Sequence, residues 1–312
     1  MSLGSAIVIG SGGQVAEALR HSLRERGTAV LQTSSSGRAG CVPLNLADSA
    51  SIHNGFTELD SLLKGRSAEV FLAGALTHVD GCEEKQELCR KINEEGPALV
   101  AEECARRGHR LTYFSSEYVF GEAEYHGGSI GPFSETDEPA PTSFYGKCKL
   151  EAEKKVSAKL SDALIIRTTM VFSWAPGGNN FVMQVHKHLS EIAAGSTPPL
   201  FRIPVDQIST PTYAPALAEA VCQLREKGVG GIVNLVGSDC LSRKAFVEKI
   251  IESFGFEKEK SLAGFTFLKT ADLKQIARRP LSAGLKVDKA KSLGVKILSL
   301  DEAFNEMEKL RS

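Results

Sequence analysis

The stretch SAIVIGSGGQVAEAL, residues 5–19, decides the fold of this chain. A short β-branched run at residues 6–9 leads into a glycine-rich turn, and apolar residues then recur at the spacing of one helix face. In this Gly-x-x-Gly-x-x-Ala pattern, Gly10 allows the tight turn, Gly13 lets the backbone approach a pyrophosphate, and Ala16 allows close helix–strand packing. Because free N–H groups at a helix N-terminus favour an anion, the stretch predicts a dinucleotide site on a βαβ unit.

Similar β-branched runs alternate with helix-length segments, which is typical of a parallel, doubly wound sheet. The expected strands are residues 6–9, 29–32, 41–43, 70–73, 111–114, 164–167 and 232–235. After Thr168, prolines interrupt the pattern, and the C-terminal part reads as helices and loops. We therefore expect a Rossmann-type α/β domain at residues 4–167, to which the strand near 232–235 returns, and a smaller C-terminal α/β domain at 168–312.

A long helical pattern runs from residue 80 to residue 107 and carries many Glu and Arg residues. Charges spread along a helix in this way usually face solvent rather than form a binding patch. The segment therefore predicts one long helix with a solvated face.

The composition excludes several classes of protein. The 312 residues include 37 Lys and Arg against 38 Asp and Glu, a formal net charge of -1 that lacks the basic excess of a nucleic-acid binder. The longest apolar stretches, such as residues 68–76, fall far short of the ~18 residues that a membrane span needs, and no basic-then-apolar leader opens the chain. Seven cysteines without a Cys-x-x-Cys pair indicate reduced structural thiols. We expect a cytoplasmic globular protein with no nucleic-acid or membrane partner.

The segment after the second expected strand bears on the choice of dinucleotide. A fold that prefers NAD usually has Asp or Glu about 20 residues beyond the glycine turn, where it binds the ribose 2′-hydroxyl. No acid lies between Thr28 and Ala47, and Ser34 and neighbouring hydroxyls are followed by Arg38. These groups suit a 2′-phosphate, although a polar surface turn would look the same. We expect NADPH as cofactor, with NADH as the open alternative.

Tyr145 and Lys149 form a candidate catalytic pair. Tyr145 has a lysine four residues later, and on a helix the two side chains share a face. A nearby cation would lower the phenol pKa from its ordinary ~10 and make it a better proton donor and acceptor. Ser116 ends the fifth expected strand, where ligands of parallel sheets bind, so its hydroxyl either polarises a carbonyl or merely caps the strand end.

With these residues in place, the chain resembles the extended short-chain dehydrogenase/reductase family, and within it the dTDP-4-dehydrorhamnose reductase group. The matching segments are residues 10–19 (GSGGQVAEAL), 72–80 (LAGALTHVD), 93–105, 115–120 (SSEYVF), 145–153 (YGKCKLEAE), 167–172 (RTTMVF), 179–181, 206–213 (DQISTPTY) and 279–280. The resemblance implies Tyr145 as the acid, Lys149 as its partner and ribose ligand, and Ser116 as the carbonyl-polarising hydroxyl. It also implies cofactor contacts at Gly13, Gln14, Val15, Asn45, Leu46, Ala73, Gly74 and Ala75.

The chain departs from the group's usual residues at four positions, Leu72, Leu76, Glu117 and Met170. Glu117 stands where the group usually has Asp, and Met170 where it usually has Trp. Both match positions near the sugar, as does Asn180, so we expect these three to contact substrate together with Ser116. A methionine offers less surface for stacking on a sugar than an indole, so the substrate preference should differ from the usual 4-keto rhamnose precursor.

The resemblance implies an NADPH-dependent reductase of the 4-keto group of a nucleotide-linked deoxysugar. Some members of the group are described as using a metal. The carboxylates that would bind it cannot be mapped onto this chain, so we expect no metal. Two alternatives stay open: a sugar-nucleotide epimerase or dehydratase, and a non-catalytic NADP-binding regulatory subunit. The expected partner is the nucleotide sugar, and a homodimer is compatible with the sequence.

Overall fold

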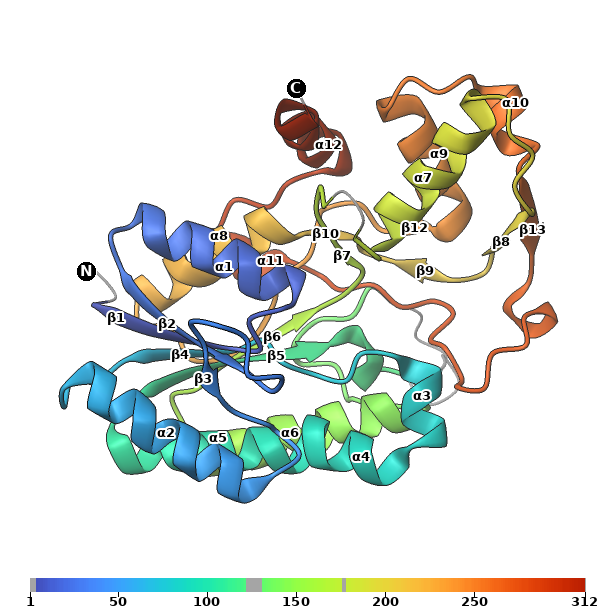
Figure 1. Ribbon diagram of the computed structural model, residues 1–312. Coiled ribbons are helices and arrows are strands. Elements are labelled where there is room, and N and C mark those ends of the chain that lie inside the picture. The colour runs from blue at the N-terminus through green and yellow to red at the C-terminus, as the bar shows by residue number, and fades with distance from the viewer. Residues whose placement is uncertain (1–3, 122–130, 176–177, 312) are drawn as a thin grey trace.

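A seven-stranded parallel sheet forms the centre of the computed structural model, which describes residues 4–121, 131–175 and 178–311 (Figure 1). The strands lie in the order β11-β6-β5-β4-β1-β2-β3. Their bounds are β1 Ser5–Ile9, β2 Ala29–Ser34, β3 Val42–Pro43, β4 Glu69–Leu72, β5 Arg110–Ser116, β6 Leu164–Thr168 and β11 Gly231–Asn234. Each expected strand lies in this sheet, and the predicted Rossmann-type architecture is confirmed.

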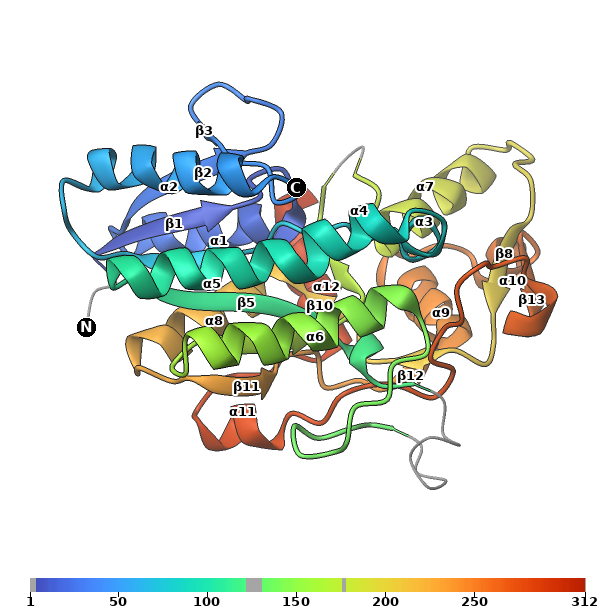
Figure 2. The ribbon, with the colours of Figure 1, turned by 90° about the horizontal axis from the view of Figure 1, so that it is seen from below.

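Helices cover both faces of the sheet (Figures 1 and 2). On one face lie α1 Gln14–Glu25, α8 Ala214–Glu226 and α11 Asp288–Ser292. On the other face lie α2 Ser49–Leu63, α5 Gly96–Arg107 and α6 Phe144–Lys159. The longest of these, α6, has 16 residues. Within the parts of the chain that the structure describes, no helix is both long and apolar enough to cross a bilayer.

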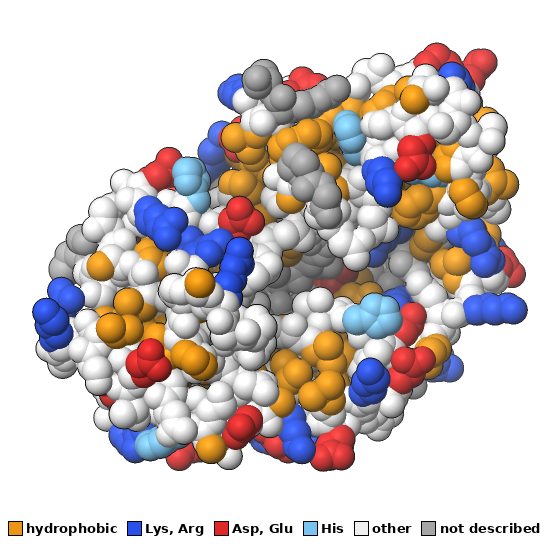
Figure 3. All heavy atoms as spheres, viewed as in Figure 1, with side chains coloured by type: hydrophobic (Ala, Val, Ile, Leu, Met, Phe, Trp, Pro, Cys, Tyr) orange, Lys and Arg blue, Asp and Glu red, His pale blue; other side chains and the backbone are white. Residues whose placement is uncertain are grey.

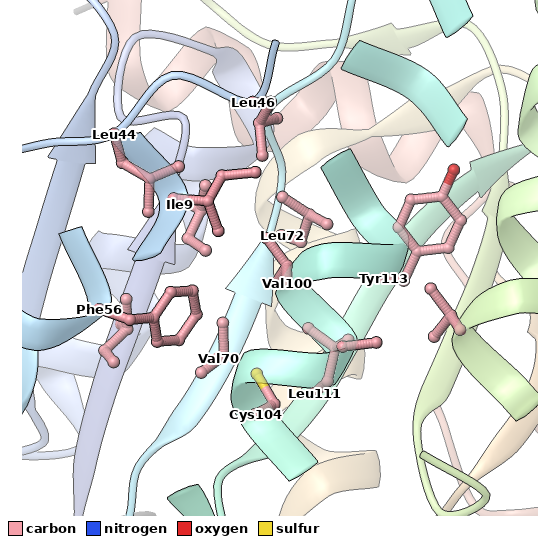
Figure 4. Packing of buried hydrophobic residues seen from close by; sticks show 14 of the residues in the cluster. Ile9, Leu44, Leu46, Phe56, Val70, Leu72, Val100, Cys104, Leu111 and Tyr113 are labelled. Atoms are coloured by element: carbon pink, nitrogen blue, oxygen red, sulfur yellow. The ribbon is translucent and has the colours of Figure 1, made fainter. Parts of the chain in front are cut away.

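The central strands are largely apolar because both of their faces are buried. In β1, Ile7 and Ile9 pack against α2 and α5, whereas Ala6 and Val8 face α1 and α8. Figure 4 shows the first of these two clusters, in which Phe56 of α2 lies among side chains from the strands. Burial on both faces gives the continuous β-branched runs that made the strands visible in the sequence.

A second lobe packs beside the carboxyl edge of the sheet. Its helices are α7 Phe181–Ala193, α9 Arg243–Ser253, α10 Lys258–Leu262 and α12 Leu300–Arg311. Its short strands are β7 Val171–Phe172, β8 Phe201–Pro204, β9 Ile208–Ser209, β10 Thr212–Tyr213, β12 Leu241–Ser242 and β13 Phe265–Leu268. Aromatic residues fill its core, where Phe172 contacts both Phe246 and Phe304.

The segment expected as one long helix is divided. It comprises α3 Val79–Glu84, α4 Gln86–Arg90, a π-helical turn Lys91–Glu95 and α5. The chain bends at Lys85, whose backbone leaves the helical region, and Cys82, Cys89 and Asn93 are fully buried. The prediction of one continuous helix is wrong because the chain bends at Lys85 and forms the π-helical turn. Its outer side carries the solvated charges as expected, while its inner side packs against α6.

Candidate active site

A cleft of about 460 Å³ lies at the carboxyl edge of the sheet, between the two lobes (Figure 3). Its lining comes from the first turn of α1, the ends of β4, β5 and β6, the start of α6, and the second lobe. A second cavity of about 410 Å³ adjoins it and shares Gly13, Ala73, Ala75 and Thr77. The two cavities lie where the strand order reverses between β1 and β4, which is where sheets of this kind bind ligands.

The glycine-rich turn forms one wall of the second cavity. Gly10 has φ +93°, and a Cβ there would lie 2.5 Å from Cα of Gly74, so the ends of β1 and β4 can approach this closely only without a side chain. At Gly13, which precedes α1, a Cβ would meet only the carbonyl oxygen of Gly10 at 4.0 Å. The open turn at the start of a helix fits the phosphates of a dinucleotide.

Hydroxyls also line this cavity. Ser34 ends β2, and its Oγ accepts a hydrogen bond from the backbone N of Ser36 at 3.2 Å. Asn45 and Leu46 also line the cavity, together with Ala73, Gly74 and Ala75. Arg38 lies beyond the serines in an exposed loop and is not part of the wall.

Ser116, Tyr145 and Lys149 line the first cleft together. The α6 helix begins with a cap in which Ser143 Oγ accepts a hydrogen bond from Gly146 N, and this places Tyr145 in the first turn. Ser116 Oγ is hydrogen-bonded to the Tyr145 hydroxyl and also accepts from Tyr118 N at 3.3 Å. The serine therefore both caps the turn after β5 and contacts the phenol.

Burial governs the ionisation of this pair. It raises the pKa of Tyr145 above its ordinary value, although the hydrogen bond from Ser116 acts in the opposite direction. The expected lowering of the Tyr145 pKa is wrong because the effect of burial prevails, although the Lys149 ammonium lies 5.8 Å from the centroid of the Tyr145 ring. The same ammonium donates to Phe114 O at 2.9 Å. Burial lowers the pKa of Lys149 itself to about 8, against the opposing effect of Glu153. At neutral pH the site holds a protonated phenol beside a lysine that is mostly charged.

Three buried thiols pack against Tyr145. Cys82, Cys89 and Cys148 form one apolar cluster with Tyr145. Asn93 Nδ2 donates to Leu76 O at 2.8 Å and lies 3.4 Å from the Cys89 sulfur. All seven cysteines are free, as the sequence predicts, but no spacing in the sequence indicates that three of them meet behind the site. Among the described residues, no group of His, Cys, Asp or Glu side chains is arranged to hold a metal ion.

Glu117 does not face the cleft. Its buried carboxylate accepts hydrogen bonds from Thr169 Oγ1 at 2.5 Å, from Ser209 Oγ at 2.9 Å and from Gly284 N at 3.2 Å. Burial raises its pKa, and these three donors act in the opposite direction. The implied substrate contact is therefore corrected: the carboxylate ties the end of β5 to the second lobe, and a charged group turned inward needs such partners.

Of the other two implied substrate residues, Met170 lies in the cleft lining and Asn180 does not. Met170 lines the cleft and has φ +41°, a conformation rare outside glycine that costs about 1–3 kcal/mol. Asn180 is buried and caps α7, where its Oδ1 accepts from Met183 N at 3.0 Å. Its Nδ2 donates to Gln14 Oε1 at 2.9 Å, so Asn180 supports the cleft wall through Gln14.

The chain is similar to known proteins over nearly its whole length. The family model for the RmlD substrate binding domain matches residues 5–310. The chain belongs to this family. It is 31% identical over 286 residues to the probable low-salt glycan biosynthesis reductase Agl14 of Haloferax volcanii, with 90% of this chain and 89% of that protein covered. The resemblance expected from the sequence is confirmed.

Two solved structures share the fold of this chain over nearly its whole length. The crystal structure of a dTDP-4-dehydrorhamnose reductase from Clostridium acetobutylicum matches with a TM-score of 0.82 at 25% identity, covering 98% of this chain and 99% of that one. A dTDP-4-dehydrorhamnose reductase from Bacillus anthracis in complex with NADP matches with a TM-score of 0.82 at 21% identity, with the same coverage. The second likeness shows the fold alone.

Several residues of the cleft were not predicted from the sequence. Thr168 and Thr169 line it at the end of β6, and Phe181 and Arg243 reach it from the first residues of α7 and α9. Phe181 falls in a segment that matches the family, which was the available signal. Arg243 carried no signal, because only the fold brings α9 to this cleft.

Proposed function

We propose that this chain is an NADPH-dependent reductase of the 4-keto group of a nucleotide-linked deoxysugar. One observation carries the proposal: Ser116, Tyr145 and Lys149 line a single cleft that adjoins the cavity of the glycine-rich turn. The names of the relatives, a probable glycan biosynthesis reductase and a dTDP-4-dehydrorhamnose reductase, support this reaction and this substrate class.

The residues of the second cavity are suited to hold the dinucleotide. The open backbone at Gly13 would receive the diphosphate, and the hydroxyls after β2, with Arg38 beyond them, would receive a 2′-phosphate. The neighbour from Bacillus anthracis, which shares the fold, is in complex with NADP. When bound, the nicotinamide supplies the hydride.

The chain's own residues would handle the proton. The Tyr145 hydroxyl, kept protonated by burial, donates its proton to the oxygen of the substrate carbonyl, and Ser116 hydrogen-bonds the same oxygen as negative charge develops. Lys149 places a positive charge on the same side and would hold the nicotinamide ribose. In this proposal residues 4–167 with β11 hold the cofactor, and residues 168–312 mostly hold the sugar nucleotide.

The test is turnover of purified protein with NADPH and a panel of dTDP-, UDP- and GDP-linked 4-keto-6-deoxysugars, followed by loss of NADPH absorbance. We expect at least one of these sugars to be reduced, and NADH to serve less well. If none is reduced, and the purified protein carries tightly retained oxidised cofactor, the epimerase or dehydratase reaction replaces the proposal. If none is reduced but NADPH binds and a partner protein co-purifies, the chain is a regulatory subunit.

A further inference from the structure

The cleft is positively charged. Its described lining residues include two cations, Lys149 and Arg243, and no carboxylate. Lys149 belongs to α6 and is already engaged by Phe114 O and by the ring of Tyr113. Arg243 comes from the other lobe, as the first residue of α9. The two charges therefore approach the cleft from different parts of the fold.

Arg243 keeps its hydrogen-bond donors uncommitted. Its Cζ lies 5.1 Å from the ring centroid of Phe181, which also lines the cleft. Among the described residues its guanidinium forms neither a hydrogen bond nor an ion pair, whereas the nearby Arg279 is paired with Asp80 at 2.9 Å. The Glu117 carboxylate influences Arg243 only at longer range, since its oxygens are occupied by other donors.

The Arg243 side chain is half-buried, and no hydrogen-bonded partner compensates for the water that its guanidinium loses. Burial lowers the pKa of Arg243, and the opposing influence of Tyr118 and Glu117 does not cancel that effect. A half-buried cation that faces the cleft with free donors is stabilised when an anion enters. The planar group rests on the Phe181 ring, which favours a fixed orientation and suits two-pronged binding of a phosphate.

We propose that Arg243 binds the diphosphate of the sugar nucleotide and so sets the requirement for a nucleotide-linked substrate. This inference rests on the proposed function. The reaction brings two diphosphates to the protein, and the glycine-rich turn is suited to the one in the cofactor. The second must lie on the substrate side of the cleft, where Arg243 is, among the described lining residues, the cation whose hydrogen-bond donors are unoccupied.

The test compares the affinities of dTDP and thymidine, measured by calorimetry with the cofactor-loaded protein. In Arg243→Gln we expect the affinity for dTDP to fall about 10- to 100-fold, because hydrogen bonds to a charged group are lost, and the affinity for thymidine to stay unchanged. Lys244→Gln is the matched control, since it removes the same charge one residue later from an exposed side chain outside the cleft. The control should bind dTDP like the parent.

Three results would overturn the inference. The first is that Arg243→Gln binds dTDP as tightly as the parent, and the second is that its affinities for thymidine and dTDP fall equally. The third is that the parent binds none of dTDP, UDP and GDP. If Arg243→Gln no longer retains NADPH, Arg243→Lys replaces it, and we expect an intermediate loss of dTDP affinity because the charge stays but the planar fork does not. If dTDP binding depends on Arg243 but no keto sugar is reduced, the diphosphate site stands and the proposed reductase activity fails.

Discussion

Asn180 and Gln14, 166 residues apart in the chain, meet in a hydrogen bond of 2.9 Å from Nδ2 to Oε1. Gln14 is the first residue of α1, and Asn180 caps α7 in the second lobe. Ser173 Oγ donates to the same Gln14 oxygen at 2.9 Å. The start of the helix that follows the glycine-rich turn is thereby fixed to the lobe that carries Phe181 and Arg243, so the relation between the two halves of the cleft depends on this contact.

Replacement of Asn180 should therefore affect both stability and the cleft. Asn180→Ala removes the cap of α7 and the bond to Gln14, and we expect a loss of about 1–3 kcal/mol in the free energy of unfolding, with a raised KM for the sugar nucleotide. Asn180→Ser keeps a capping oxygen but is too short to reach Gln14. In urea denaturation the stability of Asn180→Ser should lie between those of the parent and the alanine variant, while its KM should match that of the alanine variant. Equal stabilities of the two variants would show that the cap contributes nothing.

Cofactor preference should depend on Arg38. We expect Arg38→Ala to weaken NADPH binding about 10- to 100-fold and to leave NADH binding unchanged, because only NADPH carries the 2′-phosphate. Fluorescence titration of both reduced cofactors gives the ratio. Arg24→Ala, which removes an exposed charge from the last turn of α1, should leave it unchanged. An unaltered ratio in Arg38→Ala would mean that the exposed loop takes no part in binding.

The parts of the fold that the sequence predicted are those with a local cause. Strands buried on both faces are largely apolar runs, and β1, β4, β5 and β6 at the centre of the sheet are of this kind. In the second lobe β9 and β10 have two residues each, too few for any periodicity to appear. The Tyr145 and Lys149 pair was visible for the same reason as the long strands, because an i, i+4 spacing on a helix is local.

The errors share a different cause, which is tertiary packing. The direction of the shift in the Tyr145 pKa depends on burial of the tyrosine against the thiol cluster. The inward orientation of Glu117 depends on donors from distant segments, Ser209 and Gly284. Arg243 reaches the cleft only because α9 packs against α7. Neither residue spacing nor composition contains this information.

The pH dependence of the reaction should report Lys149. Because burial lowers its pKa to about 8, the charged form is lost as the pH rises through that value. If turnover needs the charge, kcat/KM with NADPH should be level near neutral pH and fall about tenfold per pH unit above 8. In Lys149→Arg the charge persists, so the decline near pH 8 should vanish even if the rate is lower throughout. The same decline in that variant would assign it to another group.

Glu117 should affect stability rather than substrate binding. Burial raises the pKa of its carboxyl above the unfolded value, so the stability it contributes is fully present below that unfolded value, near 4.5, and is lost as the pH rises through the folded value. Glu117→Gln cannot ionise, so the stability difference, parent minus variant, should shrink as the pH is raised from about 4 to 8 in urea denaturation. The KM for the sugar nucleotide should change little, because the carboxylate does not line the cleft. A large change in KM with a constant stability difference would restore the substrate contact.

Tyr145→Phe separates an enzyme from a binding subunit most directly. The substitution keeps the ring, which packs edge-on against Tyr118 at 5.6 Å between centroids, and removes only the hydroxyl that contacts Ser116. Loss of a positioned general acid typically costs ~10²–10⁴-fold in rate, whereas loss of one ordinary hydrogen bond costs about 1 kcal/mol, or about fivefold. We expect the larger loss in kcat, with NADPH affinity within a few-fold of the parent.

Tyr113→Phe is the matched control, because its buried hydroxyl points to Asn93 O, outside the cleft lining, and it should turn over like the parent. Normal turnover by Tyr145→Phe would show that another group delivers the proton.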